Sequence, residues 1–250
     1  MQRRTSLYHC TDYKSLCMIL SAGYYIPSYC LEEFSILYNN KMNMAYAVVC
    51  FADLLVDEVN HHMKTFRSDS YLMMSKKWAI KNNISPVIYY TDKSNMASYL
   101  GNIIQYAGKQ YVQQNLTGAR NVEELKFVNS SQMLLAYLKQ YEGRYWMKKE
   151  EKFSEITNFY TEREWRYVPM PTNNEAFYID EKEFMNKQLK KQKQEELVEK
   201  DYVVRFKWDD IEEIGIPKWA EGNFWQHINN NAELAADQIN SKLHLLEIEL

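Results

Sequence analysis

Residues 159–169 read FYTEREWRYVP, and this stretch says most about the fold and chemistry of the chain. With the two-residue period of a β-strand, Tyr160, Glu162, Glu164 and Arg166 fall on one face. Burying two carboxylates is costly unless they are paired with cations or needed for chemistry. The stretch therefore predicts a strand whose glutamates are catalytic, bind a partner, or form a structural pair with a guanidinium.

The N-terminal segment shows a second compact pattern. Residues 5–10 alternate like a short strand, and Thr11-Asp12 offers a helix N-cap. Apolar residues then recur at helical spacing over 13–20, and Gly23 stops the helix. His9 therefore ends a strand directly before a capped helix, where it is either a hydrogen-bonded structural residue or part of a site.

The remaining elements alternate irregularly, so we expect one α+β domain over residues 1–250 rather than a doubly wound parallel sheet. Two long helices predict a helical insertion at about 94–155, and a mixed-charge segment predicts a solvated helix at about 181–200. The other predicted elements are strands at 45–55, 71–74, 86–90, 202–208 and 215–217, helices at 56–66, 76–81, 94–116, 122–141 and 231–245, and a turn at 209–214. Ser75 is the predicted N-cap of the helix at 76–81.

Composition excludes several classes of protein. The net charge is −3 and the pI is about 6.0, so we expect no nucleic-acid partner. No apolar run reaches the length of a membrane span, and the N-terminus lacks the apolar core of a signal peptide, so we expect a cytoplasmic protein without a membrane partner. The four cysteines form no CxxC pair, and we expect no metal.

The ordered recurrence of four segments resembles the AbiGi family of abortive phage resistance proteins. These segments are Leu7–Thr11 with the following helix and Gly23, Val49–Leu54, Leu72–Tyr90 and Tyr160–Pro169. The resemblance runs from residue 7 to about 217. It implies a role in bacterial phage defence as the antitoxin half of a toxin–antitoxin system, with a nucleotidyltransferase-like toxin as the partner.

A second resemblance, to the ADP-ribosyltransferase superfamily, implies a split mixed or antiparallel sheet and NAD as the cofactor. Carried over by position, His9 contacts the ribose, Ser75 takes the middle-strand role, and Glu164 or Glu162 is catalytic. The serine-rich run of that superfamily is missing, since Met73-Met74-Ser75 stands there. The further residues expected at NAD are Tyr8, Thr11, Tyr24, Tyr160 and Arg166, with Tyr25, Arg163 and Arg67 as alternatives for stacking or for the pyrophosphate.

Two functions therefore stay open at this point. A non-catalytic antitoxin would bind a toxin through a protein surface. An NAD-using transferase or glycohydrolase would hold the ribose between His9 and the strand at 160–166, where a fixed carboxylate stabilises the charge that develops on the ribose.

Overall fold

A computed structural model describes residues 5–117, 121–147, 150–170, 177–230 and 239–247. Its centre is a sheet of nine described strands, with the order β17-β16-β5-β1-β4-β13-β6 and with β3 and β14 also paired to β4. These strands are β1 (Ser6–Thr11), β3 (Ser28–Glu33), β4 (Asn43–Ala52), β5 (Ser70–Ser75), β6 (Ser85–Pro86), β13 (Glu164–Tyr167), β14 (Tyr178–Asp180), β16 (Ile211–Pro217) and β17 (Leu243–Leu246).

The longest of these strands, β4, changes partners along its length. Its first half pairs with β3 and β14, and residues Val49–Ala52 pair with β13. β4 is long and almost wholly buried because its run of apolar and small residues suits a strand covered on both faces. The expected α+β class is confirmed, and the likeness to ADP-ribosyltransferases stays a prediction.

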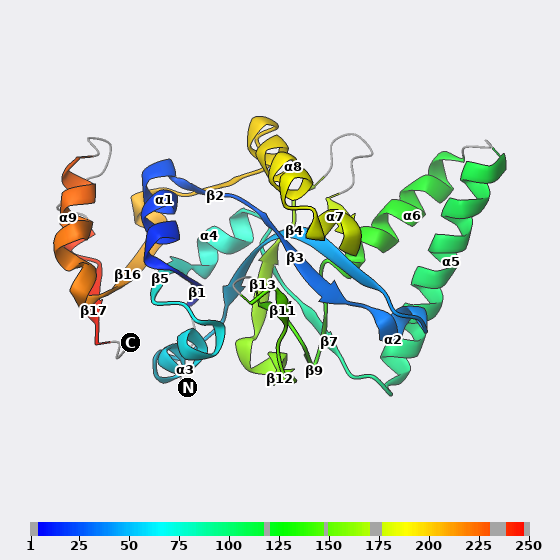
Figure 1. Ribbon diagram of the computed structural model, residues 1–250, viewed down its shortest axis with the longest axis horizontal. Coiled ribbons are helices and arrows are strands. Elements are labelled where there is room, and N and C mark those ends of the chain that lie inside the picture. Colours follow the sequence, from blue (N-terminus) through cyan, green and yellow to red (C-terminus); the bar gives the residue numbers. More distant parts are fainter. Residues whose placement is uncertain (1–4, 118–120, 148–149, 171–176, 231–238, 248–250) are drawn as a thin grey trace.

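Helices cover the two faces of the sheet unequally (Figure 1). One face packs on α1 (Tyr13–Ala22), α4 (Lys76–Lys81) and α9 (Glu221–Asn229) through a core that includes Leu16, Trp78 and Phe224. On the other face, α3 (Val56–Phe66) packs Val59 and Met63 against β1 and β4. The two faces therefore have separate cores, and the parity of a residue in its strand decides which core it enters.

The N-terminal predictions are confirmed in detail. Asp12 caps α1 by accepting a hydrogen bond from the Ser15 amide at 2.9 Å, and Gly23 ends the helix with a φ of 70°. Ser75 caps α4 by accepting from the Trp78 amide. These devices act within a few residues, which is why the sequence alone reveals them.

The predicted helical insertion is wrong beyond residue 135. α5 (Asn95–Thr117) and α6 (Val122–Leu135) form a hairpin at one end of the molecule, packed on α2 (Ser35–Tyr38). The chain then turns to strands, because residues 136–140 cross to pair with β7 (Ile88–Tyr90) instead of continuing α6. These strands are β8 (Leu138–Gln140), β9 (Glu142–Gly143), β10 (Trp146–Met147), β11 (Lys152–Phe153) and β12 (Thr157–Asn158).

Two predictions near the C-terminus also need correction. The predicted turn at 209–214 is the 3-10 helix η2 (Trp208–Asp210) followed by the start of β16. Of the predicted helix at 231–245, residues 231–238 lie outside the described residues, residues 239–240 are helical, and β17 begins at Leu243. β16 and β17 form because each finds a neighbour far away in sequence. The charged segment is helical as predicted, in two pieces, α7 (Glu181–Met185) and α8 (Lys187–Glu199). Short elements complete the described fold: β2 (Tyr24–Tyr25), paired with β15 (Val204–Arg205), and the 3-10 helices η1 (Phe159–Glu162) and η3 (Lys218–Ala220).

Candidate functional site

A cavity of about 320 Å³ opens on the face of the sheet that α3 covers. Its floor includes Cys50 of β4 and Glu164 and Arg166 of β13, and Glu32 reaches it from β3. The segment from β8 to β10 supplies a further wall that contains Lys139, Tyr145 and Trp146. The cavity thus gathers side chains from distant parts of the sequence; Glu32 and Arg166, for example, are 134 residues apart.

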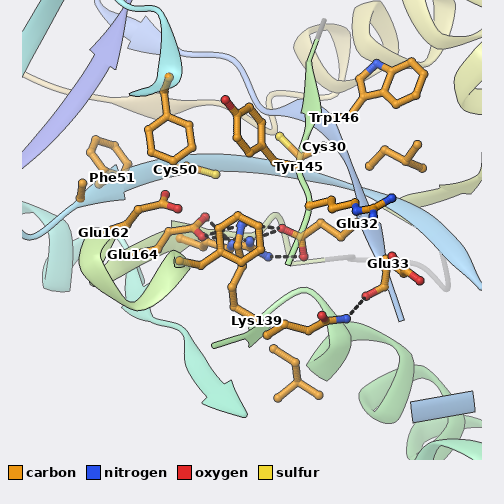
Figure 2. Close-up of a pocket in the computed structure, with 18 of the residues that line it drawn as sticks. Cys30, Glu32, Glu33, Cys50, Phe51, Lys139, Tyr145, Trp146, Glu162 and Glu164 are labelled. Atoms are coloured by element: carbon orange, nitrogen blue, oxygen red, sulfur yellow. Dashed lines mark hydrogen bonds and ion pairs between the residues drawn. The ribbon is translucent and has the colours of Figure 1, made fainter. Parts of the chain in front are cut away.

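Four charged side chains form a buried cluster in this cavity (Figure 2). Arg166 donates to Glu164 from Nε to Oε1 at 2.6 Å and from Nη2 to Oε2 at 3.1 Å. Its guanidinium also donates to Glu32 and, at 2.7 Å, to the carbonyl of Ala136. The ammonium of Lys139 lies 3.1 Å from both Glu32 and Glu164. Each carboxylate is therefore bound by two cations, and the four charges balance.

The cluster sets the protonation of its own members. Burial acts to raise the pKa of Glu164, but the adjacent Arg166 and Lys139 outweigh it and hold that pKa well below its usual range. Burial acts to lower the pKa values of Lys139 and Arg166, yet Glu164 and Glu32 raise both well above their usual ranges. Glu164, Lys139 and Arg166 therefore favour their charged forms, as a buried ion-pair cluster requires.

Glu162 reaches the same cavity by a different route from the one predicted. It lies in η1, and Arg163 follows with a φ of 45°, so the strand begins only at Glu164. The predicted continuous strand across residues 160–167 is therefore wrong. The left-handed turn at Arg163 nevertheless brings the carboxylate of Glu162 into the cavity beside that of Glu164 (Figure 2).

The Oε1 atom of Glu162 is buried and has no hydrogen-bond partner among the residues that the structure describes. Burial raises the pKa of Glu162 to about 8; Lys139 opposes this rise and the charge of Glu164 adds to it. The carboxyl groups of Glu162 and Glu164 therefore have opposite proton affinities although they line one cavity. Glu164 is a satisfied ion-pair member, and Glu162 is the carboxyl group with unused bonding capacity.

The structure does not bring His9 together with either glutamate. Tyr8, Ala52 and Glu164 are in register across three strands and share the cavity face. His9 is next to Tyr8 in the strand and therefore points to the opposite face, where its ring lies 5.5 Å from that of Phe51. Its Nδ1 lies 2.8 Å from the carbonyl oxygen of Cys50.

The other residues expected at NAD are scattered. Only Arg166 lines the cavity with the two glutamates. Ser75 is a helix cap, Tyr24 pairs with β15, and Tyr160 stacks on Tyr141 at 5.4 Å. The remaining expected residues make contacts elsewhere. Tyr8 packs on Tyr71, and Tyr25 lies in the core beside His9. The Thr11 carbonyl accepts a hydrogen bond from the Asp69 amide, Arg163 donates to the Asp53 carbonyl, and Arg67 pairs with Glu150.

Sequence reasoning missed two members of the cluster, Glu32 and Lys139. Glu32 lies on the opposite face of its strand from the buried residues Tyr29 and Leu31, a position where alternation predicts an exposed charge, so its parity did not indicate the cluster. Lys139 gave no signal either, because it fell within the helix predicted at 122–141. No three His, Cys, Asp or Glu side chains in the described ranges are grouped so that they could hold a metal. Likewise, none of the described helices has both the length and the apolar character needed to cross a bilayer.

Comparison with known proteins identifies the family. Residues 24–217 match the family model described as "Putative abortive phage resistance protein AbiGi, antitoxin". The "Abortive phage resistance protein AbiGi" of Lactococcus lactis subsp. cremoris is 26% identical over 159 residues, which is 58% of this chain and 61% of that relative. The aligned part thus spans less than two thirds of the relative's length, and no solved structure matches the chain. Because the family model covers well over half of the sequence, this chain belongs to the AbiGi family of abortive phage resistance proteins.

Proposed function

We propose that this protein acts as the antitoxin of an abortive-infection system by binding a toxin protein and keeping it inactive. The observation that carries the proposal is the match of residues 24–217 to a family whose description includes the word antitoxin. We further propose that the toxin is nucleotidyltransferase-like, which rests on the family resemblance alone.

The charged cluster supports a role without catalysis at Glu164. Both oxygens of Glu164 accept from Arg166 or lie beside Lys139, and the residue is only 2% exposed. A carboxylate held in this way has no free oxygen for a substrate unless the cluster opens. The cluster therefore joins β13 to β3 and β8, and it supports a structural function.

An exposed apolar stripe on α5 supports a protein contact on that helix. Met96, Tyr99, Ile103 and Tyr106 are all exposed, although each is large and apolar, and Tyr99 is 65% exposed. Their spacings of three, four and three residues place them in one stripe along the helix. We name these four residues the α5 stripe.

The composition of α5 fits a helix that docks on an apolar groove. Lys109 is the one charged residue in its 23-residue sequence, and tyrosines are frequent at the energetic centres of interfaces. An amphipathic helix with apolar residues at this spacing is a common recognition element. We therefore place the toxin contact on the α5 stripe.

The test uses the product of the gene beside this one. We expect that product to stop bacterial growth when it is expressed alone, and co-expression of this protein to restore growth and give a complex that co-purifies. Replacing Tyr99 and Ile103 together by Ser should abolish rescue and co-purification at an unchanged melting temperature, since both side chains are exposed.

The matched control changes two exposed polar residues on another helix, α8. The double substitution Gln188→Ser and Gln192→Ser leaves α5 untouched and should retain rescue. A neighbouring product without toxicity would refute the antitoxin role. Rescue that persists with both Tyr99 and Ile103 replaced would move the contact away from α5.

The geometry argues against the NAD-using alternative. It requires His9 and a glutamate in one site, and they lie on opposite faces of the sheet. The cavity around Glu162 is better explained by a different ligand.

A further inference from the structure

Glu162 places a carboxyl oxygen that has no hydrogen-bond partner among the described residues in a cavity large enough for a small molecule. The cavity volume of about 320 Å³ lies within the range of small-molecule sites. Glu162 lines it, and its buried Oε1 has no partner among the described residues. A buried polar atom without a partner is unfavourable, because it has lost its hydrogen bonds to water. A ligand that donates a hydrogen bond to this atom would recover that loss on binding.

The net charge of the cavity lining indicates the charge that a ligand should carry. Four carboxylates face three cations, so an ionised Glu162 leaves one negative charge in excess. Burial lowers the pKa of His62 to about 4, which keeps its ring neutral near pH 7. The lining carboxylates are Glu32, Glu33, Glu162 and Glu164, and the cations are Lys139, Arg144 and Arg166. One added positive charge would bring the cavity to neutrality.

The aromatic wall of the cavity suits an organic cation. The rings of His62 and Phe66 are 4.7 Å apart, and those of Phe66 and Tyr145 are 5.1 Å apart. Tyr145 is fixed by its hydroxyl, which donates to the Thr65 carbonyl at 3.0 Å. The cavity already holds one cation against a ring, since the ammonium of Lys139 lies 4.5 Å from the centre of the Phe159 ring. A cation placed over such rings is attracted by the negative face of the π-system.

We propose that this cavity binds one organic monocation, an ammonium or guanidinium group on a short apolar stem. The charged group donates a hydrogen bond to Glu162, and the stem packs along the aromatic wall formed by Phe66, Tyr145 and Trp146. Figure 2 shows the side chains of Glu162 and Glu164 side by side, with Tyr145 and Trp146 in the same cavity. The proposal does not involve the α5 stripe, so its failure would leave the antitoxin role untouched.

The decisive probes are n-butylguanidinium and its neutral isostere n-butylurea. The two have nearly the same shape and both donate N–H groups, so a difference in affinity reports the charge. By calorimetry, we expect the guanidinium to bind at least about tenfold more tightly, which is roughly 1.4 kcal/mol. Equal binding of the two compounds, or no binding of the guanidinium at millimolar concentration, would overturn the proposal.

Variants locate the binding within the cavity. Glu162→Gln keeps the shape of the side chain and should weaken n-butylguanidinium binding about tenfold, the loss expected from a single charge-assisted hydrogen bond. Glu155→Gln changes an exposed carboxylate outside the cavity and should have no effect. Trp146→Leu offers a second test on the aromatic wall and should also weaken binding. Unchanged affinity in both cavity variants would place the cation elsewhere.

The pH dependence of cation binding is a further test. Because burial raises the pKa of Glu162 to about 8, the affinity for the cation should increase as the pH rises from about 6 to about 9. Cys10 stays neutral over this range because burial raises its thiol pKa to about 12. The charged and titratable groups that face Glu162 are Lys139 on β8, Glu164 and Arg166 on β13, Glu32 on β3, Tyr89 on β7, Cys10 on β1 and His62 on α3. Tyr89 also stays neutral over this range, because burial raises the pKa of its hydroxyl well above the usual value. Affinity that stays flat across this range would exclude Glu162 as the acceptor.

A guanidinium group occurs on small free guanidines and on the arginine side chains of proteins. N-acetylarginine N-methylamide carries the guanidinium on a peptide backbone and separates these sources. If this compound binds as tightly as n-butylguanidinium, the opening of the cavity admits an arginine side chain of a protein. Much weaker affinity would assign the site to a free small cation.

Discussion

Replacing Arg166 by Met tests whether the buried charges act as one cluster. Arg166 is 1% exposed, and its guanidinium donates to Glu164, Glu32 and the carbonyl of Ala136. Methionine fills a similar length without charge. The variant would leave Glu164 and Glu32 to share the single positive charge of Lys139.

The expected loss follows from the burial of the charges that remain. Removing one partner from a buried ion pair typically costs about 3–5 kcal/mol, because an uncompensated charge stays in the interior. Globular domains have a free energy of unfolding of about 5–15 kcal/mol, so this loss is a large fraction of the total. Replacing Arg166 and Glu164 together by Met restores the balance between Glu32 and Lys139, and should recover stability to within about 1–2 kcal/mol of the wild type.

Urea unfolding followed by tryptophan fluorescence provides the measurement. The m-value, which is the slope of the free energy of unfolding against urea concentration, should stay unchanged. Lys191→Met is the control, because Lys191 is exposed and lies 3.6 Å from Glu195; its loss should stay below about 0.5 kcal/mol. A loss below about 1 kcal/mol for Arg166→Met would refute the reasoning. So would a double variant no more stable than the single one.

Two further predictions concern protonation and packing. The pKa of Glu162 is about 8 in the folded protein and about 4.5 in the unfolded chain, so the free energy of unfolding of the wild type should fall between about pH 5 and about pH 8. Glu162→Gln should remove that part of the pH dependence. Parallel curves of unfolding free energy against pH for the two proteins would contradict this. Gly215→Ala should destabilise the protein by about 1–3 kcal/mol in thermal or urea unfolding, because its Cβ would meet the buried ring of Tyr71 at 2.3 Å. Gly222→Ala, with open space around its Cβ, is the control, and equal effects of the two substitutions would refute the packing argument.

The local features of the fold were readable from the sequence. Asp12, Gly23 and Ser75 act on atoms within four residues of themselves, and each occupies its predicted cap. The apolar run of β4 likewise needs no knowledge of its partners. Such features depend on backbone hydrogen bonds and steric limits that do not change with tertiary context.

The candidate site was only partly readable. The stretch 159–169 indicated buried carboxylates and a guanidinium partner, and Glu164 with Arg166 is that pair. Parity placed Glu162 on the same face, but parity holds only along an unbroken strand. The left-handed Arg163 interrupts the strand, and Glu162 enters the cavity from a 3-10 turn.

By itself, the sequence determined the capped helices, the buried strand β4 and the family to which the chain belongs. Only the tertiary structure decided that His9 and Glu164 point to opposite faces, and that Lys139 and Glu32 complete the cluster. The reason is physical. A cap is satisfied by neighbours along the chain, whereas a buried charge is satisfied by whichever partner the packing of strands brings within about 3 Å, at any distance in sequence.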